Sequence, residues 1–222
     1  MDPQSLHFVG KSHGLLLDLL GVIVIPVVSR KYEGRDMVQS EGASFGKSLF
    51  VLGGARSGKS RHAQDMAEAL AKNDTVELIY IATAQAFDGE MTDRIARHRS
   101  DRDDRWQTVE APLALAEALL AADARDTVML VDCLTLWVSN LLLADVPIAA
   151  RIDALLHAIG RLEGRVIIVS NEVGLGIVPD NALARRFRDA TGMLHQRIAS
   201  SVESVDIVMA GLVQRWKAPL RP

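Results

Sequence analysis

The sequence contains little cysteine and no surplus of either charge. Its 222 residues include one cysteine, Cys133, which excludes an intramolecular disulfide and any cysteine-rich metal site. We expect that cysteine to be a small buried hydrophobe. The formal net charge is only -3, which provides no general attraction to nucleic acid or to an anionic membrane. These absences favour a soluble protein of a reducing compartment such as the cytoplasm, with neither nucleic acid nor membrane as a partner.

A long uninterrupted apolar run is also missing. The apolar stretch over residues 15–28 is interrupted by Asp18 and Pro26 and is too short to span a membrane. The residues that follow it are polar and contain glycine and serine, which is typical of a linker. We therefore expect residues 1–48 to be an N-terminal extension, either poorly ordered or upstream of the true start, and residues 49–222 to be the folded domain.

Beyond residue 48, short apolar runs alternate with longer amphipathic segments. Strands that are apolar without alternation are typical of a parallel sheet covered on both faces. The pattern predicts an α/β fold of the phosphate-loop NTPase type, with a mostly parallel sheet and helices on both faces. The expected strands are 49–53, 78–83, 128–132, 166–170 and 205–210. The expected helices are 59–72, 89–100, 112–121, 134–143, 148–162 and 181–201.

A phosphate-binding loop with the pattern G-x-x-x-x-G-K-S begins at Gly53. Its glycines allow successive backbone N–H groups to converge on phosphate oxygens. Lys59 supplies a point charge for the β and γ phosphates, and Ser60 offers a hydroxyl to Mg²⁺. The position between an apolar run and a helical pattern favours a nucleotide site over a simple glycine-rich turn. The expected nucleotide contacts are Gly53, Gly54, Ala55, Arg56, Ser57, Gly58, Lys59 and Ser60.

A second nucleotide-site strand is indicated by the apolar run 128–131, which ends in the carboxylate of Asp132. At the carboxyl end of a parallel strand, Asp132 would lie in the crevice where ligands bind and could hold Mg²⁺ directly or through water. An aspartate at this place could equally cap the next helix. The phosphate loop upstream favours the metal.

A histidine amid arginines forms the least common pattern. His98 follows Met91 and Ile95 at helical spacing and shares their apolar face, with Arg94 one turn before it. A neutral imidazole is a competent nucleophile towards phosphorus, so His98 is a candidate for covalent phosphoryl or nucleotidyl transfer. Spacing alone favours the alternative, a hydrogen-bonded core histidine beside solvated arginines. The next candidate nucleophile is His62, just after the phosphate loop.

A shaped loop with two glycines and a proline follows the predicted strand 166–170. Asn171 and Glu172 stand at its entrance and are the expected substrate-loop residues, with Glu172 a candidate base for a kinase step. A plain connecting turn into the next helix is an equal alternative.

Several strings carry a family resemblance, among them GGARSGKSRHA, DGEMTDRIARHR, LVDCLTLWVSNLL and SNEVGLGIVPDNALARRFRD. Together they closely resemble the bifunctional adenosylcobinamide kinase and adenosylcobinamide-phosphate guanylyltransferase family over about residues 49–217. A phosphate loop alone is common to many families. Its combination with R-I-x-x-H-R and N-E-V-G-x-G-I-V-P is specific.

The resemblance implies an enzyme with two successive reactions. It would phosphorylate adenosylcobinamide with ATP or GTP, and then transfer GMP from GTP to adenosylcobinamide phosphate through a GMP-histidine at His98. It also implies Mg²⁺ as cofactor and a homotrimer in the cytoplasm. The further nucleotide contacts that it implies are Ala82, Thr83, Ala84, Arg99, Ser100, Asp101, Arg102, Glu110 and Asp132.

Two alternatives stay open at this point. One is a phosphate-loop small-molecule kinase without guanylyl transfer, in which His98 is structural. The other is a nucleotide-binding regulatory module that turns over no corrinoid. A covalent nucleotide adduct would distinguish the two-step enzyme from both.

Overall fold

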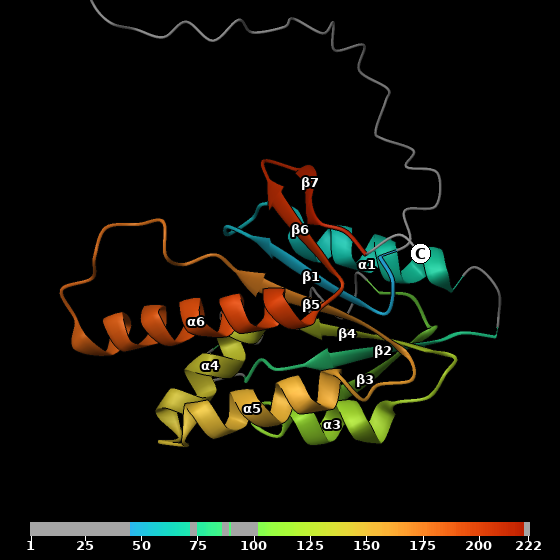
Figure 1. Ribbon diagram of the computed structural model, residues 1–222, viewed down its shortest axis with the longest axis horizontal. Helices are drawn as coiled ribbons and strands as arrows, with labels where there is room; N and C mark the ends of the chain where they lie inside the picture. Colours follow the sequence, from blue (N-terminus) through green and yellow to red (C-terminus); the bar gives the residue numbers. More distant parts are fainter. Residues whose placement is uncertain (1–44, 72–74, 86–88, 90–101, 220–222) are drawn as a thin grey trace, which may run out of the picture. The chain divides into compact units, whose positions relative to one another are not determined.

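The computed structural model describes residues 45–71, 75–85, 89 and 102–219. They form an α/β fold with one seven-stranded sheet between helices, as the sequence predicted (Figure 1). The strands are β1 (Ser48–Gly53), β2 (Glu77–Ala82), β3 (Trp106–Glu110), β4 (Thr127–Asp132), β5 (Arg165–Asn171), β6 (Ser204–Met209) and β7 (Leu212–Lys217). The helices described are α1 (Lys59–Leu70), α3 (Leu115–Ala122), α4 (Leu134–Leu143), α5 (Ile148–Ile159) and α6 (Ala182–Ser201).

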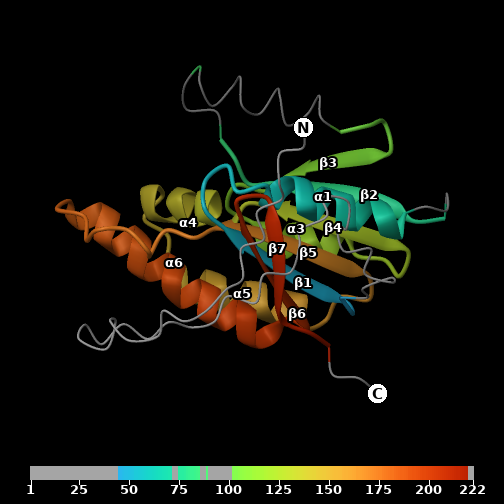
Figure 2. The same ribbon diagram turned by 90° about the horizontal axis from the view of Figure 1, so that it is seen from above.

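The strand order is β3-β2-β4-β5-β1-β6-β7, and only β7 is antiparallel to its neighbour. From above, β3 and the β6–β7 hairpin lie at opposite edges of the sheet (Figure 2). Gly53 at the end of β1 is opposite Asn171 on β5, and Ala82 at the end of β2 is opposite Asp132 on β4. Because parallel strands end at the same edge, this register gathers the predicted site residues there.

Two apolar cores, one on each face, explain why the central strands carry apolar residues at nearly every position. Ala63 and Ala67 of α1 pack against Leu49 and Val51 on one face. Trp137 of α4 belongs to the core on the other face, together with residues of α3, α5 and α6. Figure 1 shows α1 and the pair α3 and α5 on opposite sides of the sheet. Cys133 is buried, as the sequence predicted.

The strands β3 and β7 were absent from the sequence prediction. Both are edge strands with partly exposed, polar-containing sequences, which the search for buried apolar runs does not detect. The predicted strand 205–210 ends one residue early, because Ala210 and Gly211 have φ values of 52° and 79° and turn the chain into β7. The predicted helix 112–121 begins later, at Leu115. The predicted helix 89–100 lies, except for its first residue, outside the described residues.

The packed core reaches further towards the N-terminus than residue 49. Phe45 is 2% exposed and lies in the same core as Ala63 and Leu49. Its carbonyl accepts a hydrogen bond from the Ser204 hydroxyl at 2.9 Å. Burial of a phenylalanine contributes on the order of 3 kcal/mol, so Phe45 is part of the domain.

A chain that begins at Met37 is expected to keep the thermal midpoint and activity of the full chain, because it retains Phe45 and every sequence motif. Thermal unfolding and turnover of both reactions measure this. A chain that begins at Ser48 is the matched control. It lacks Phe45, and its midpoint should fall by roughly 5 °C or more. Insolubility of the chain that begins at Met37 would show instead that residues 15–28 pack onto the domain or its oligomer.

Candidate active site

The phosphate loop joins β1 to α1 through two residues in the left-handed region, Arg56 with φ 54° and Gly58 with φ 96°. Gly58 directly precedes α1, so the positive end of the helix dipole faces the loop. Lys59 is only 7% exposed, and its Nζ donates to the Gly54 carbonyl at 3.1 Å. The ammonium group therefore lies across the loop, where phosphate oxygens are expected to bind.

Backbone contacts from β6, the end of β5 and the β6–β7 turn hold the phosphate loop in place. A Cβ atom at Gly53 would lie 2.4 Å from the carbonyl oxygen of Val208 on β6, so the loop packs directly against that strand and only glycine fits. The Gly53 carbonyl accepts a hydrogen bond from Glu172 N at 3.0 Å, and the Ser57 carbonyl accepts one from Gly211 N at 2.9 Å. The end of β5 and the β6–β7 turn thus fix the loop.

Asp132 at the end of β4 lies beside a tyrosine and an arginine. Tyr80 of β2 lies within the electrostatic influence of the Asp132 carboxylate. Burial, reinforced by the charge of Asp132, raises the pKa of Tyr80 well above its ordinary value, so the hydroxyl keeps its proton at physiological pH. The guanidinium of Arg102 stacks on the Tyr80 ring, 3.6 Å from its centroid. Two of the predicted nucleotide contacts, Asp132 and Arg102, therefore both influence Tyr80.

The end of β2 supplies three more of the predicted contacts. Ala82 and Ala84 are partly exposed, and Glu110 on β3 is opposite Ala82 in the sheet. The Thr83 side chain is buried instead, and its hydroxyl donates to the Cys133 carbonyl at 2.8 Å and accepts from Cys133 N at 2.9 Å. Thr83 thus ties β2 to β4, while the other three residues line the edge next to Asp132.

The charges of Asp132 and Lys59 both act on the buried Cys133 thiol. Burial and the neighbouring Asp132 charge raise the pKa of Cys133, whereas a hydrogen bond from Thr135 and the charge of Lys59 lower it. The strand before Lys59 and the strand that ends at Asp132 are parallel to β5, which lies between them, so both residues follow the same edge of the sheet. The two charges that the sequence assigned to the nucleotide site therefore lie at one edge.

The donor set at this edge fits Mg²⁺. Ser60 on the first turn of α1 and Asp132 offer a hydroxyl and a carboxylate, both half-exposed. Within the described ranges, no group of three or more His, Cys, Asp or Glu side chains could hold a metal by itself. Mg²⁺ usually takes one or two protein oxygens and completes its shell with phosphates and water, so a metal that arrives with the nucleotide suits these residues.

Asn171 and Glu172 shape the loop that follows β5. Asn171 Nδ2 donates to the Thr135 hydroxyl at 3.0 Å. The two carboxylate oxygens of Glu172 accept from Gly174 N at 2.8 Å and from Leu175 N at 3.1 Å. Glu172 therefore holds its own loop in shape, and in this arrangement both of its oxygens are already hydrogen-bonded.

A buried histidine, His195, contacts the end of β5 just before that loop. His195 Nε2 is 2.7 Å from the hydroxyl of Ser170, the residue that precedes Asn171, and its ring packs against Phe50. Burial lowers the pKa of His195 to about 4, against a weaker opposing effect of the Glu172 charge. The imidazole is therefore neutral at physiological pH and anchors β5 to α6.

Stability is expected to fall as the pH decreases from about 6.5 to about 4. Unfolded histidine binds a proton in this range and native His195 does not, so the unfolded state gains protons and is favoured. The shift corresponds to at most about 3 kcal/mol. Urea unfolding from pH 7 to 4.5 measures this, and His195→Gln should have a flatter profile. His157→Gln, at an exposed position on α5, is the control and should keep the wild-type slope. Parallel profiles for all three proteins would contradict the assignment.

Some predicted site residues cannot be placed, and some placed residues were not predicted. His98, Arg99, Ser100 and Asp101 lie outside the described residues, whereas Arg102 at the end of the same motif is described. Tyr80 was missed because a tyrosine inside an apolar strand has the pattern of a core residue. His62 has its Nε2 2.9 Å from a carboxylate oxygen of Asp206, which the sequence gave no reason to pair with it.

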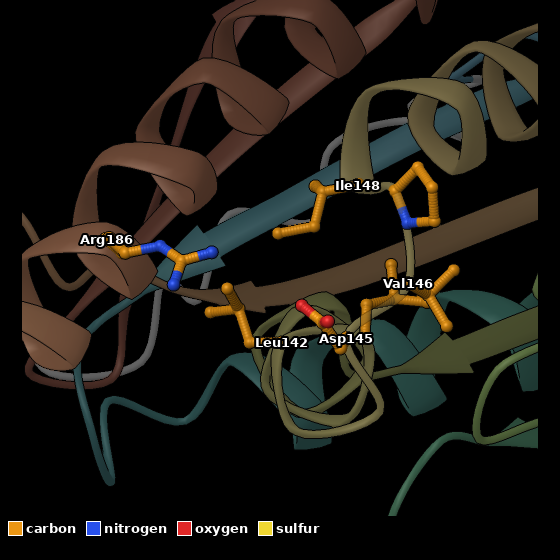
Figure 3. Close-up of a pocket in the computed structure, with 7 residues that line it drawn as sticks. Leu142, Asp145, Val146, Ile148 and Arg186 are labelled. Atoms are coloured by element: carbon orange, nitrogen blue, oxygen red, sulfur yellow. The ribbon is translucent and has the colours of Figure 1, made fainter.

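One cavity in the structure lies away from these residues. It has a volume of about 380 Å³ and lies between the end of α4, the start of α5 and α6. Leu142, Val146 and Ile148 give it apolar walls, and Asp145 and Arg186 lie at its sides (Figure 3). None of the residues that line it was predicted as a site residue.

Comparisons with known proteins identify the family of the chain. The sequence model of the family described as cobinamide kinase / cobinamide phosphate guanyltransferase matches residues 49–216. The bifunctional adenosylcobalamin biosynthesis protein CobP of Pseudomonas aeruginosa is 52% identical over 164 residues, covering 73% of this chain and 92% of that protein. The bifunctional adenosylcobalamin biosynthesis protein CobU of Escherichia coli is 40% identical over 179 residues, covering 74% and 96%.

Among solved structures, the flagellar accessory protein FlaH from Methanocaldococcus jannaschii aligns with a TM-score of 0.47 at 11% identity, over 82% of each chain. The family match includes the phosphate loop, Asp132 and nearly all of the described helices and strands. The chain belongs to the cobinamide kinase / cobinamide phosphate guanyltransferase family and is a bifunctional transferase of cobalamin biosynthesis.

Proposed function

We propose that the enzyme phosphorylates the aminopropanol hydroxyl of adenosylcobinamide with ATP or GTP, and then links GMP from GTP to that phosphate to give adenosyl-GDP-cobinamide. The observation that carries the proposal is the shared edge of the sheet, where the Lys59 ammonium, the Asp132 carboxylate and the Tyr80-stacked Arg102 lie. Both reactions need a triphosphate held in one orientation, and this edge offers a single phosphate loop for both.

In the kinase step the loop binds and orients the triphosphate. Backbone N–H groups of the loop and Lys59 hold the β and γ phosphates, so that the substrate hydroxyl oxygen meets the γ phosphorus in line. The new O–P bond forms as the bond from the γ phosphorus to its bridging oxygen breaks. ADP or GDP leaves, and the hydroxyl proton is released. Mg²⁺ held by Ser60 and Asp132 would neutralise charge on the phosphates.

In the guanylyl step we propose His98 as the nucleophile. Its ring nitrogen attacks the α phosphorus of GTP, a P–N bond forms, and the bond to the β-phosphate oxygen breaks to release pyrophosphate. The phosphate oxygen of adenosylcobinamide phosphate then attacks the same phosphorus and displaces His98. Arg102, which stacks on the Tyr80 ring, would stabilise charge on the α phosphate during both displacements.

The test is incubation with GTP labelled at the α phosphate, with Mg²⁺, followed by peptide mass mapping. We expect one GMP group per chain on the peptide that contains His98, lost in acid and retained in base. Adenosylcobinamide phosphate should remove the label and yield the GDP-linked product. Formation of that product without any adduct would disprove the covalent route and leave the kinase assignment intact.

We also propose that the enzyme is a homotrimer, as the family resemblance implies. Exposed large apolar side chains support an assembly, because burial in an interface would remove them from water. Trp216 on β7 is 70% exposed and Ile177 in the loop after β5 is 97% exposed, and Met209 and Leu212 of the hairpin are exposed as well. Sedimentation equilibrium should give three times the chain mass, and a monomer at micromolar concentration would contradict this.

We place the reactions in the cytoplasm, where ATP and GTP are available. The one cysteine, buried as a free thiol, is compatible with a reducing compartment. Over the described ranges, the structure contains no helix with the length and apolar character needed to cross a membrane.

A further inference from the structure

A buried carboxylate connects the β6–β7 hairpin to the first turn of α1. Asp206 on β6 is 1% exposed. Its Oδ2 is 2.9 Å from His62 Nε2 and accepts a hydrogen bond from Arg215 Nη2 at 3.1 Å. Its Oδ1 accepts a hydrogen bond from Arg215 Nε. Arg215 lies directly opposite Asp206 in the antiparallel ladder. Asp206 therefore joins a helix and a strand that are far apart in sequence.

The same hairpin contacts the phosphate loop at two backbone points. The Val208 carbonyl lies where a side chain of Gly53 would be, and Gly211 N donates to the Ser57 carbonyl. Residues two apart on a strand point to the same face, so Asp206 and Val208 both face α1 and the loop. The hairpin thus supports the loop at its beginning, at its middle and at the helix that follows it.

The negative charge on Asp206 strengthens its hydrogen bonds with His62 and Arg215. Burial alone would raise the pKa of this carboxyl, but hydrogen bonds from His62 and Arg215 keep the pKa below its ordinary value. The carboxylate is therefore ionised at physiological pH and requires its partners, because an unpaired buried charge is strongly destabilising. His62 is three residues beyond Lys59, so the position of its ring is coupled to the N-terminus of α1.

We propose that Asp206, His62 and Arg215 are positioning residues that hold the phosphate loop in its triphosphate-binding geometry for both reactions. Phosphate binding by a loop requires its N–H groups and lysine to be placed to within about 0.5 Å. A hairpin that moves away from α1 would release the Ser57 and Gly53 contacts together. The role of His62 is then to hold the helix, and its Nε2 is committed to Asp206. The inference rests on nucleotide binding at this loop.

The experiment compares Arg215→Met with Arg197→Met. Arg197 forms an ion pair with Asp153 at 2.6 Å between α6 and α5, away from the loop and more exposed than the Arg215–Asp206 pair. Its variant is the control for the loss of a paired arginine elsewhere in the fold. Titration with fluorescent GTP and ATP analogues plus Mg²⁺ gives Kd, and steady-state kinetics give KM and kcat. For Arg215→Met we expect Kd and KM of both nucleotides to rise about tenfold, or ~1.4 kcal/mol, with the corrinoid KM within about twofold of wild type. Arg215→Lys should restore most of the affinity, and Arg197→Met should match wild type.

Unchanged nucleotide Kd in a folded Arg215→Met protein with a lower thermal midpoint would overturn the proposal, because the network would then be purely structural. If Arg215→Met does not fold, the pair His62→Phe and His62→Gln replaces it. The phenylalanine removes the bond to Asp206 and should weaken nucleotide binding about tenfold, and the glutamine keeps a donor and should restore part of it. Equal wild-type affinity in both would overturn the proposal. A wild-type protein that binds neither nucleotide would refute the proposed function itself.

Discussion

Replacing Lys59 with alanine is expected to abolish both the kinase and the guanylyltransferase reactions. The lysine is buried, and its Nζ reaches across the loop to the Gly54 carbonyl. A point charge in such a shielded place stabilises the triphosphate more strongly than a charge in water would. Because one loop holds the triphosphate in both steps, one substitution should affect both. We expect turnover of each step to fall by far more than tenfold, that is by more than ~1.4 kcal/mol of barrier.

The control for this variant is Lys47→Ala. Lys47 is exposed and lies just before β1, at the opposite end of the strand from the loop, so its replacement should leave both turnover numbers unchanged. Circular dichroism and thermal unfolding establish that Lys59→Ala is folded. If a folded Lys59→Ala protein retains either activity within tenfold of wild type, the phosphate loop is not the shared triphosphate site.

The sequence predicted the buried strands, and the edge at which the proposed site residues gather, because both have strong local patterns. Runs such as 128–131 are apolar at every position, and a parallel sheet requires their polar ends to meet at one edge. The predicted bounds of α4 and the predicted start of α1 coincide with those observed. The edge strand β7 could not be predicted in this way, since it has no buried face and is fixed by its turn and its pairing with β6.

The supporting residues of the site were not predictable, because they depend on long-range pairing. Nothing local to Asp206 indicates that its carboxylate meets a histidine 144 residues earlier in the chain. Tyr80 likewise becomes a site residue only when β2 lies beside β4 and Arg102 returns over its ring. Motifs identify the groups that touch phosphate, whereas the fold determines which side chains hold those groups in place.

Replacing His98 with asparagine is expected to separate the two reactions. Asparagine keeps a polar side chain of similar reach but lacks the imidazole nucleophile. Guanylyl transfer should fall at least about 1000-fold, or ~4 kcal/mol of barrier, while nucleotide binding persists. Kinase turnover should fall much less, since that transfer needs no covalent intermediate. His157→Asn, at an exposed position on α5, is the control and should form the adduct as wild type does.

The label transferred from GTP identifies the residue that carries the covalent GMP. Wild type should carry an acid-labile, base-stable phosphoramidate, and His98→Asn should carry none. Covalent GMP on His98→Asn would place the nucleophile elsewhere. His62 would then be the next residue to test, although its Nε2 is engaged by Asp206, which in turn is held by Arg215. Because only a free ring nitrogen can attack phosphorus, His62 would have to react through Nδ1 or leave Asp206, and Asp206→Asn would then change the rate of adduct formation.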